Sequence, residues 1–211
     1  MLCYAVPIKL GCLRSKSMKW LKIAAVAALV ASICAPALAQ SGTNGLDFVN
    51  AVRARDGNKA TQLLEAHPTG LVDTRDGDGN TGLIISVARG DVDWTAFMIN
   101  HGADPNLPGK GGDTPLIAAS RIGFEEGAAW LLEVSAKVDL ANRMGETPLI
   151  IAVQQRQVPI VRLLLEAGAN PDKTDSAAGL SARDYATRDP RARDILNLIN
   201  SKRPKASATA N

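Results

Sequence analysis

The chain has 211 residues, of which 46% are hydrophobic, 21% are charged and only 4% are aromatic. So few aromatic side chains argue against a β-sandwich or a large enzyme core and favour helices packed through Ala, Leu, Ile and Val. The formal net charge is +3, but five of the 24 basic residues and none of the 21 acidic residues precede residue 40, which leaves 19 − 21 = −2 for the rest. That charge gives no reason to expect binding to nucleic acid or to a membrane surface.

Residues 1–39 are predicted to be a signal peptide. The segment Met18–Gln40 begins with two lysines among its first five residues, continues with an uncharged apolar run of 13 residues and ends in Ala-Leu-Ala-Gln. A basic start, a short apolar run and small residues before a cut are the parts of a secretory signal. Because 13 apolar residues are too few to span a bilayer as a helix, a retained membrane anchor is the weaker alternative. We expect cleavage after Ala39, and both Met1 and Met18 stay open as the initiator.

All three cysteines (Cys3, Cys12 and Cys34) precede this cleavage site. The mature protein would therefore have neither a disulfide nor a cysteine nucleophile, which suits an exported protein in an oxidising compartment. An alanine-rich signal that ends in Ala-Leu-Ala is typical of bacteria. We expect a periplasmic or secreted protein with no membrane attachment after cleavage.

The rest of the chain repeats itself with a fixed period. Thr81 lies in NTGLIISVARG, Thr114 in DTPLIAASRIG, Thr147 in ETPLIIAVQQR and Ser181 in the weaker copy LSARDYATRD, at steps of 33, 33 and 34 residues. Such a period indicates supersecondary units that stack on one another. The predicted organisation is an N-terminal cap unit, three full units, a C-terminal cap unit and a disordered tail: 45–75, 76–108, 109–141, 142–174, 175–200 and 201–211.

Each unit is predicted to contain two short helices. Threonine is a good N-cap and proline suits the first helical position, so Thr114-Pro115 should start a helix that ends near Gly123. A second helix follows, and a polar hairpin-like finger returns to the next threonine. Two helices cannot bury both faces alone, so stacking must supply the core. The predicted fold class is an all-α solenoid of helix-turn-helix units with finger loops.

Large apolar residues recur in the second helices, at Phe97-Met98, Trp130-Leu131 and Leu163-Leu164. Their common offset predicts that Trp130 lies in the core. For Trp94, packing is favoured over a role in an interface, although tryptophan is common in binding hot spots.

The pattern DxxGxTPLxxAAxxG followed by LLxxGAxxx resembles the ankyrin repeat. Gly112–Leu116, Gly145–Leu149 and Leu164–Ala169 match it directly, and the resemblance covers nearly all of residues 40–200. This chain departs from the family at several positions. Isoleucine replaces the histidine that usually follows Thr-Pro-Leu, Gly82 replaces the proline, and Ser135 and Arg156 stand at glycine positions. The resemblance implies a divergent array in which apolar packing replaces a usual hydrogen-bond contact.

Three short motifs invite a chemical interpretation, and each is outweighed by a structural one. Asp76–Asn80 begins like a calcium loop but lacks the glycine and glutamate that complete it, so a finger turn is favoured. Gly109–Thr114 lacks the residue order of a phosphate loop. His67 and His101 have no cysteine or second histidine at a metal-binding spacing. We therefore expect no catalytic or metal site and no cofactor.

The resemblance implies binding of another protein on the concave surface formed by the finger tips and the inner faces of the first helices. The residues that we expect to contact the partner precede each threonine and alternate in charge: Arg75, Asp78, Asn80, Lys110, Asp113, Arg143, Met144 and Glu146. Ordinary solvated turn residues are the alternative for each. The expected function is that of an exported, non-enzymatic protein-binding module. A secreted effector that acts on host proteins is the first alternative, and a small-ligand binder, metal binder or enzyme is the less favoured one.

Overall fold

The computed structural model describes residues 41–67 and 70–201, and all the regular elements of these residues are helical. The predicted signal peptide lies outside these residues, as does the predicted tail except for Ser201, which is the last residue of a helix. No helix in the described ranges is long and apolar enough to cross a bilayer. The elements are α2 (Ser41–Ala54), α3 (Gly57–Ala66), α4 (Gly82–Ala88), α5 (Val92–Asn100), the 3₁₀ turn η1 (Lys110–Gly112), α6 (Pro115–Ile122), α7 (Glu125–Glu133), α8 (Pro148–Gln154), α9 (Val158–Glu166), α10 (Ala182–Arg188) and α11 (Arg193–Ser201).

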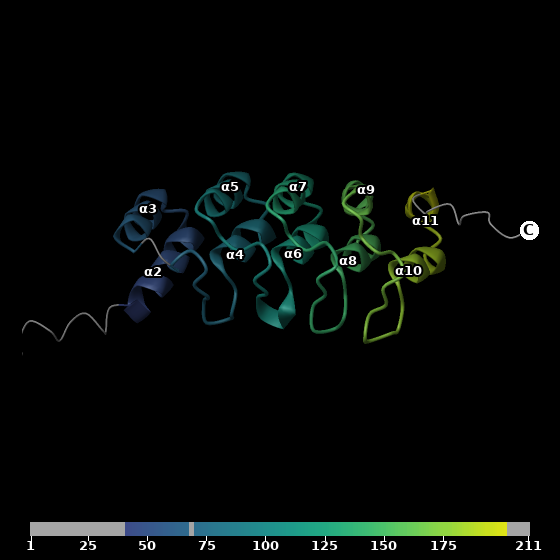
Figure 1. Ribbon diagram of the computed structural model, residues 1–211, viewed down its shortest axis with the longest axis horizontal. Helices are drawn as coiled ribbons and strands as arrows, with labels where there is room; N and C mark the ends of the chain where they lie inside the picture. Colours follow the sequence, from purple (N-terminus) through teal and green to yellow (C-terminus); the bar gives the residue numbers. More distant parts are fainter. Residues whose placement is uncertain (1–40, 68–69, 202–211) are drawn as a thin grey trace, which may run out of the picture. The chain divides into compact units, whose positions relative to one another are not determined.

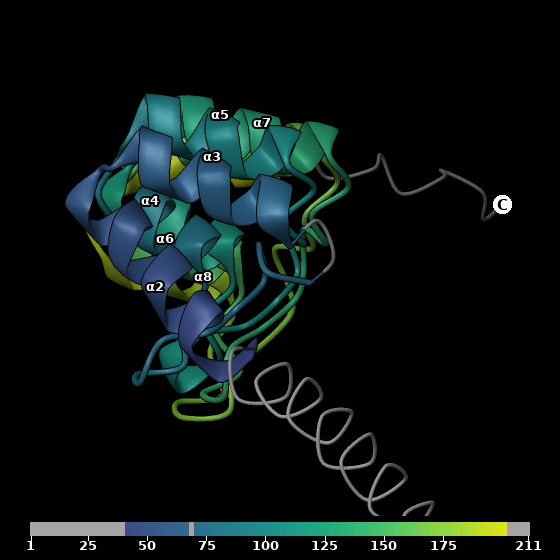
Figure 2. The ribbon, with the colours of Figure 1, turned by 90° about the vertical axis from the view of Figure 1, so that its left-hand side faces the viewer.

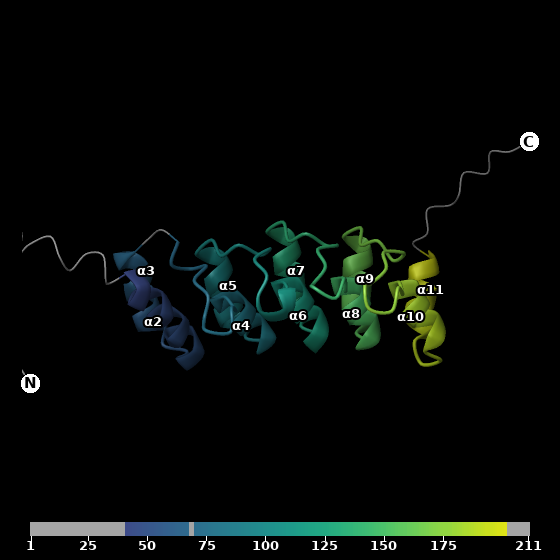
Figure 3. The ribbon, with the colours of Figure 1, turned by 90° about the horizontal axis from the view of Figure 1, so that it is seen from below.

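The helices form two parallel rows, with the finger loops on one side (Figures 1 and 2). The first helices α2, α4, α6, α8 and α10 make one row, and the second helices α3, α5, α7, α9 and α11 make the other. Within the first row α4 packs on α6, α6 on α8 and α8 on α10, and each first helix from α4 on also packs on its own second helix. Figure 3 shows the same pairs following one another along the unit that begins at Gly42. The predicted all-α repeat solenoid is confirmed.

The recurring threonines start the first helices, as predicted. The Oγ1 atoms of Thr81, Thr114 and Thr147 accept hydrogen bonds from the backbone N–H three residues later, at 3.2–3.3 Å. Proline occupies the first helical turn after Thr114 and Thr147. Gly123 ends α6 with φ = +77°, a left-handed conformation that glycine adopts without steric cost. Ser135 and Arg156 replace glycine in the same conformation, with φ = +69° and +56°, which costs an L-residue about 1–2 kcal/mol.

The core runs continuously between the stacked units. Leu83, Leu116 and Leu149 from the first helices are at most 1% exposed, and all belong to one apolar cluster together with Met98 and Leu164 from the second helices. Burial on both sides by neighbouring units stabilises helices of only seven to nine residues, which would be marginal in isolation.

Trp94 and Trp130 differ from each other in burial. Trp94 is only 9% exposed and packs edge-on against Phe97, with ring centroids 5.1 Å apart. Its predicted packing role is confirmed. Trp130 is half-buried, so the prediction that it lies in the core was wrong. The reason is that Leu131, one residue later on a helix, faces the neighbouring units and takes the fully buried position.

The departures from the repeat pattern have packing reasons. Ile84, Ile117 and Ile150, which stand where the pattern has histidine, are at most 6% exposed and supply apolar packing, as expected. Gly82 stands where the pattern has proline, and a Cβ built on it would lie 2.8 Å from Met98 Cε. Met98 is fully buried, so the longer methionine fills space that a side chain at residue 82 would need.

In the last unit, a polar residue is exposed at a position where the internal units bury an isoleucine. Asp184 of α10 stands at the position of the buried isoleucines in α4, α6 and α8, and it is exposed. Its carboxylate accepts from the Ser181 backbone N–H at 2.9 Å while the Ser181 hydroxyl accepts from the Asp184 N–H at 3.2 Å, which forms a capping box. A polar outer face of this kind is what the end of a stacked array requires.

Thr95 tests the cost of an unpaired polar group in this core. It is fully buried, and its hydroxyl is the one buried side-chain polar atom of the described residues without a hydrogen-bond partner. The equivalent residues one and two periods later are Ala128 and Val161. We expect Thr95→Val to raise the free energy of unfolding by about 1 kcal/mol, because it removes a desolvated hydroxyl at nearly constant volume. Urea unfolding measures the change; unchanged or lower stability would show that the hydroxyl is satisfied.

The finger before α10 should make the stability of the folded protein depend on pH. The Tyr185 hydroxyl donates to Asp175 Oδ2 at 2.6 Å, and this bond, with backbone donors from residues 178–180, lowers the pKa of Asp175 below its ordinary 3.8. The folded state is therefore stabilised above pH 3.8, and this stabilisation is lost as the pH falls through the lower, folded-state pKa.

We expect Tyr185→Phe to lower the free energy of unfolding by about 1.5–3 kcal/mol at pH 7, because it removes a hydrogen bond to a buried charged group. The difference from the parent protein should shrink as the pH is lowered below 3. Urea unfolding at both pH values measures it, and an equal difference at both would contradict the assigned role of the carboxylate.

Candidate functional site

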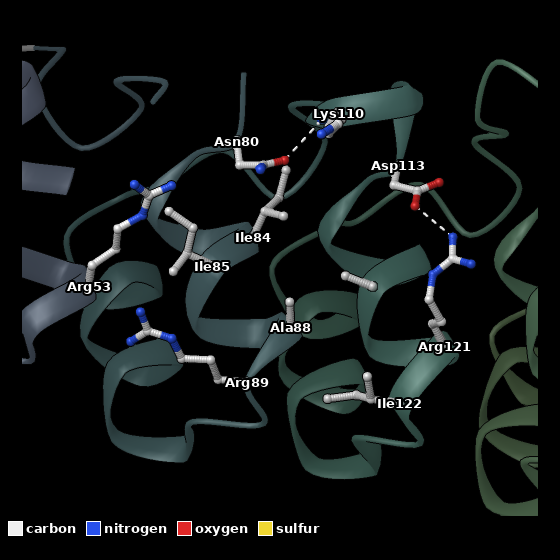
Figure 4. A pocket seen from close by; sticks show the side chains of 11 residues that line it. Arg53, Asn80, Ile84, Ile85, Ala88, Arg89, Lys110, Asp113, Arg121 and Ile122 are labelled. Carbon is white, nitrogen blue, oxygen red and sulfur yellow. Dashed lines mark hydrogen bonds and ion pairs between the residues drawn. The ribbon is translucent and has the colours of Figure 1, made fainter. Parts of the chain in front are cut away.

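A groove with a volume of about 710 Å³ lies between the fingers and the first helices of the second and third units. We call it the corner groove. Figure 4 shows its apolar side chains in the middle, with charged and polar side chains around them. Its lining residues come from α2, α4, α6 and the fingers before α4 and α6: Arg53, Asn80, Ile84, Ile85, Ala88, Arg89, Lys110, Asp113, Ala118, Arg121 and Ile122.

The floor of the groove is built from the same three positions of two successive repeats, counted from the capping threonine of each. Ile85, Ala88 and Arg89 lie four, seven and eight residues after Thr81, and Ala118, Arg121 and Ile122 lie at the same distances after Thr114. Residues three and four apart share one face of a helix. The intervening positions face the neighbouring units and are buried, so this is the face that the stacking leaves open. Ile122 is 43% exposed, a high fraction for a large apolar side chain in an otherwise buried helix.

The charges around the floor are unequally neutralised. Arg53 pairs with Asp76 at 2.5 Å and Arg121 with Asp113 at 2.6 Å. Lys110 Nζ and Asp78 Oδ1 are 3.4 Å apart, and both side chains are well exposed. This ion pair therefore adds little to the stability of the fold.

Arg89 makes no ion pair within residues 41–67 and 70–201. Its side chain donates a 3.4 Å hydrogen bond from Nη1 to the Val52 carbonyl oxygen. The other donors of its guanidinium remain available to a ligand.

Five of the eight residues predicted to contact a partner lie in the first two fingers. Arg75 is exposed and donates from Nη1 to the carbonyl oxygens of Gly79, at 2.9 Å, and Pro108. Asn80 Oδ1 accepts from the Lys110 N–H at 2.9 Å. These bonds join the two fingers. Asn80, Lys110 and Asp113 line the corner groove, whereas Arg75 and Asp78 lie outside it.

The other three lie in the third finger, and the structure does not bring them into the corner groove. Arg143 and Met144 are exposed, with Met144 52% exposed. Glu146 is only 9% exposed. Asn142 Nδ2 donates to both Glu146 Oε2 and Asp113 Oδ1 at 2.9 Å, so Glu146 belongs to the network that holds adjacent fingers together.

The helical residues of the groove were not predicted from the sequence. The inner faces of the first helices were expected to contribute in general, but all the individual residues predicted to bind lie in the fingers. The signal was present, because Arg89 and Ile122 are a charged and a large apolar side chain at the same offset from a capping threonine. Arg53 gave no such signal, since it comes from the N-terminal helix pair, where the repeat pattern is weak.

The motifs that resemble metal or phosphate sites are finger turns. The Asp76 carboxylate accepts from the backbone N–H groups of Asp78 and Asn80 at 2.8 Å and from Arg53. Its oxygens are therefore engaged within the finger and its neighbour. In the part of the chain that the structure describes, no three His, Cys, Asp or Glu side chains form a group that could hold a metal ion.

Comparison with known proteins identifies the repeat. A family model described as ankyrin repeats, in three copies, matches residues 48–142 and 97–175. No curated protein matches the chain. The matched residues cover more than half of the chain and contain every first helix from α4 to α8, the three fingers before them and the corner groove. The chain therefore belongs to the ankyrin repeat family.

Proposed function

We propose that this chain is a non-enzymatic protein-binding module that holds its partner in the corner groove and on the adjoining finger tips. Ankyrin repeats are generally protein–protein interaction modules, and the family is typically non-enzymatic. The observation that carries the proposal is the composition of the groove. It combines exposed aliphatic side chains with an arginine that makes no ion pair with any residue the structure describes, on the face that stacking leaves open.

The groove suits a protein surface better than a small molecule. Its 710 Å³ would hold a small ligand. Its polar groups, however, are spread around the rim on long, exposed side chains and do not converge on one point. Apolar contact surrounded by polar side chains is the usual anatomy of a protein interface. Exposed Arg75, Asp78, Lys110, Arg143 and Met144 extend the proposed surface along the finger tips.

We also propose that the protein works after export, in the periplasm or outside the cell. The signal peptide predicted for residues 1–39 supports this, as does the position of all three cysteines before its cleavage site. A protein without thiols would work in an oxidising compartment with no risk of unwanted disulfides.

The capture of a partner should depend on the floor of the groove. Protein expressed from the full chain is used as bait with crosslinking in a periplasmic extract of the producing cells. We expect Arg89→Ala/Ile122→Ala to lose at least 90% of the captured partner, since central anchors carry most of the binding energy of an interface. Quantitative mass spectrometry of the crosslinked products measures the loss.

Arg162→Ala/Val134→Ala is the matched control. It removes an exposed arginine and an exposed aliphatic side chain from the second-helix row, and it should capture as much partner as the parent bait. Equal capture by all three baits would place the binding surface elsewhere. Absence of specific capture by a folded parent bait would refute the proposed function.

Processing of the chain tests the proposed export. We expect intact-mass analysis of the protein purified from the periplasm or medium to show a chain that begins at Gln40. Ala39→Tyr should block cleavage, because signal peptidase sites require small residues there, while the control Ala66→Tyr, at an exposed position in α3, should not. An uncleaved parent chain confined to the cytoplasm would contradict the proposal.

A further inference from the structure

We propose that the corner groove binds an acidic peptide segment of the partner that also carries a large apolar anchor residue. This inference rests on the proposed protein-binding function and specifies the chemistry of the partner. A carboxylate of the segment pairs with Arg89, and the apolar anchor lies on Ile85, Ala88 and Ile122.

Of the three arginines that line the groove, only Arg89 has no carboxylate partner among the described residues. Arg53 and Arg121 already have carboxylates at 2.5 and 2.6 Å, so a ligand would gain little from them. Arg89 has none within the described ranges, and its side chain is held at the edge of the groove by the long hydrogen bond to Val52. A carboxylate bound there would form a charge-assisted and potentially bidentate contact. Arg89 is therefore the groove cation that selects an acidic ligand.

The anchor site adjoins this arginine. Ile122 Cδ1 would lie 3.6 Å from a Cβ built on Gly90, the residue that follows Arg89. Figure 4 shows Ala88 between Arg89 and Ile122, with Ile85 on the same side of Ala88 as Arg89. An apolar side chain placed there would cover the 43% of Ile122 that is exposed. Charge selection and apolar anchoring can thus be made by neighbouring residues of one short segment.

The apolar floor distinguishes a peptide from a polyanion. A phosphate backbone would gain nothing from Ile85 and Ile122, and it needs several free cations, whereas the groove supplies one without a carboxylate partner. The chain after residue 39 also carries a net charge of −2. The C-terminal residues of the chain itself do not fit the groove chemically, because SKRPKASATAN contains three basic residues and no acidic one.

The chemistry of the groove is not repeated at α8. The first helix of the fourth unit, α8, and its C-cap place Gln154 and Gln155 at the offsets of Ala88 and Arg89. Neutral amides there provide neither the charge nor the apolar floor. The acidic segment is therefore expected over α4 and α6 and not over α8.

Selection from a phage-displayed library of random 12-residue peptides tests the proposal with protein expressed from the full chain. We expect the selected peptides to be rich in Asp and Glu, with one Leu, Ile, Phe or Trp at a fixed distance from an acidic residue. Arg89→Ala and Ile122→Ser should each weaken binding of the best peptide about tenfold in fluorescence anisotropy, while Arg162→Ala and Val134→Ser leave it unchanged. Thermal melts establish that all variants are folded.

Reversing the charge at residue 89 is the most decisive test of the inference. Selection on Arg89→Glu should yield peptides enriched in Lys and Arg in place of Asp and Glu, and selection on Arg162→Glu should yield the parent consensus. Peptides without acidic residues, or a consensus indifferent to Arg89→Glu, would overturn the inference. So would tighter binding of a short duplex DNA than of the peptides, or a self-associated protein whose dimer dissociates in Arg89→Glu.

The two proposals can fail separately. If the natural partner is captured in a groove-dependent manner but the selected peptides are not acidic, the protein-binding function stands and the acidic-segment inference fails. If the folded parent bait captures no specific partner and the groove variants do not change peptide selection, both proposals fail.

Discussion

The structure depends on the burial of very short helices between neighbouring units. The first helices α4, α6, α8 and α10 contain seven or eight residues, too few to be stable in isolation. Both α6 and α8 are held by a neighbour on each side in the row and by their own second helices. The threonine caps, the prolines and the left-handed glycine fix where each helix begins and ends, but stacking supplies the free energy that keeps it folded.

This constraint also decides where function can lie. A helix that is buried between two neighbours and a second helix has only one open face, and in α4 and α6 that face carries Ile85, Ala88, Arg89, Arg121 and Ile122. Of these, Ala88, Arg89, Arg121 and Ile122 are exposed, so the stack does not depend on their burial. The fingers add a second open surface, whose geometry is fixed by side-chain to backbone bonds such as that from Lys110 N–H to Asn80. The corner groove is the place where the two open surfaces meet.

Several charged side chains near the groove pair with one another and so stabilise the fold itself. Asp76, Asp113 and Glu146 are carboxylates of the fingers, and they are engaged by Arg53, Arg121 and Asn142 of the same protein. Of the three, Asp113 and Glu146 had been predicted to contact a partner. These contacts within the protein order the fingers and reduce the charge that a partner would meet. Arg89 differs because it lies at the edge of the groove and pairs with no carboxylate in the described part of the chain. It therefore keeps the electrostatic attraction that the paired cations have lost.

The period of 33 residues, the Thr-Pro pairs and the apolar offsets in the sequence determined the family, the two-helix unit and the start of each first helix, because these features depend on local backbone chemistry and helical spacing. The packing of Ile84, Ile117 and Ile150 followed from the same pattern. Only the tertiary structure decided that Trp130 is half-buried, that Glu146 supports adjacent fingers, and that Arg53 joins Arg89 and Ile122 around one groove. Those outcomes depend on which side chain of one unit meets which of the next, since neighbouring units bring together residues more than 30 positions apart whose directions no single repeat specifies.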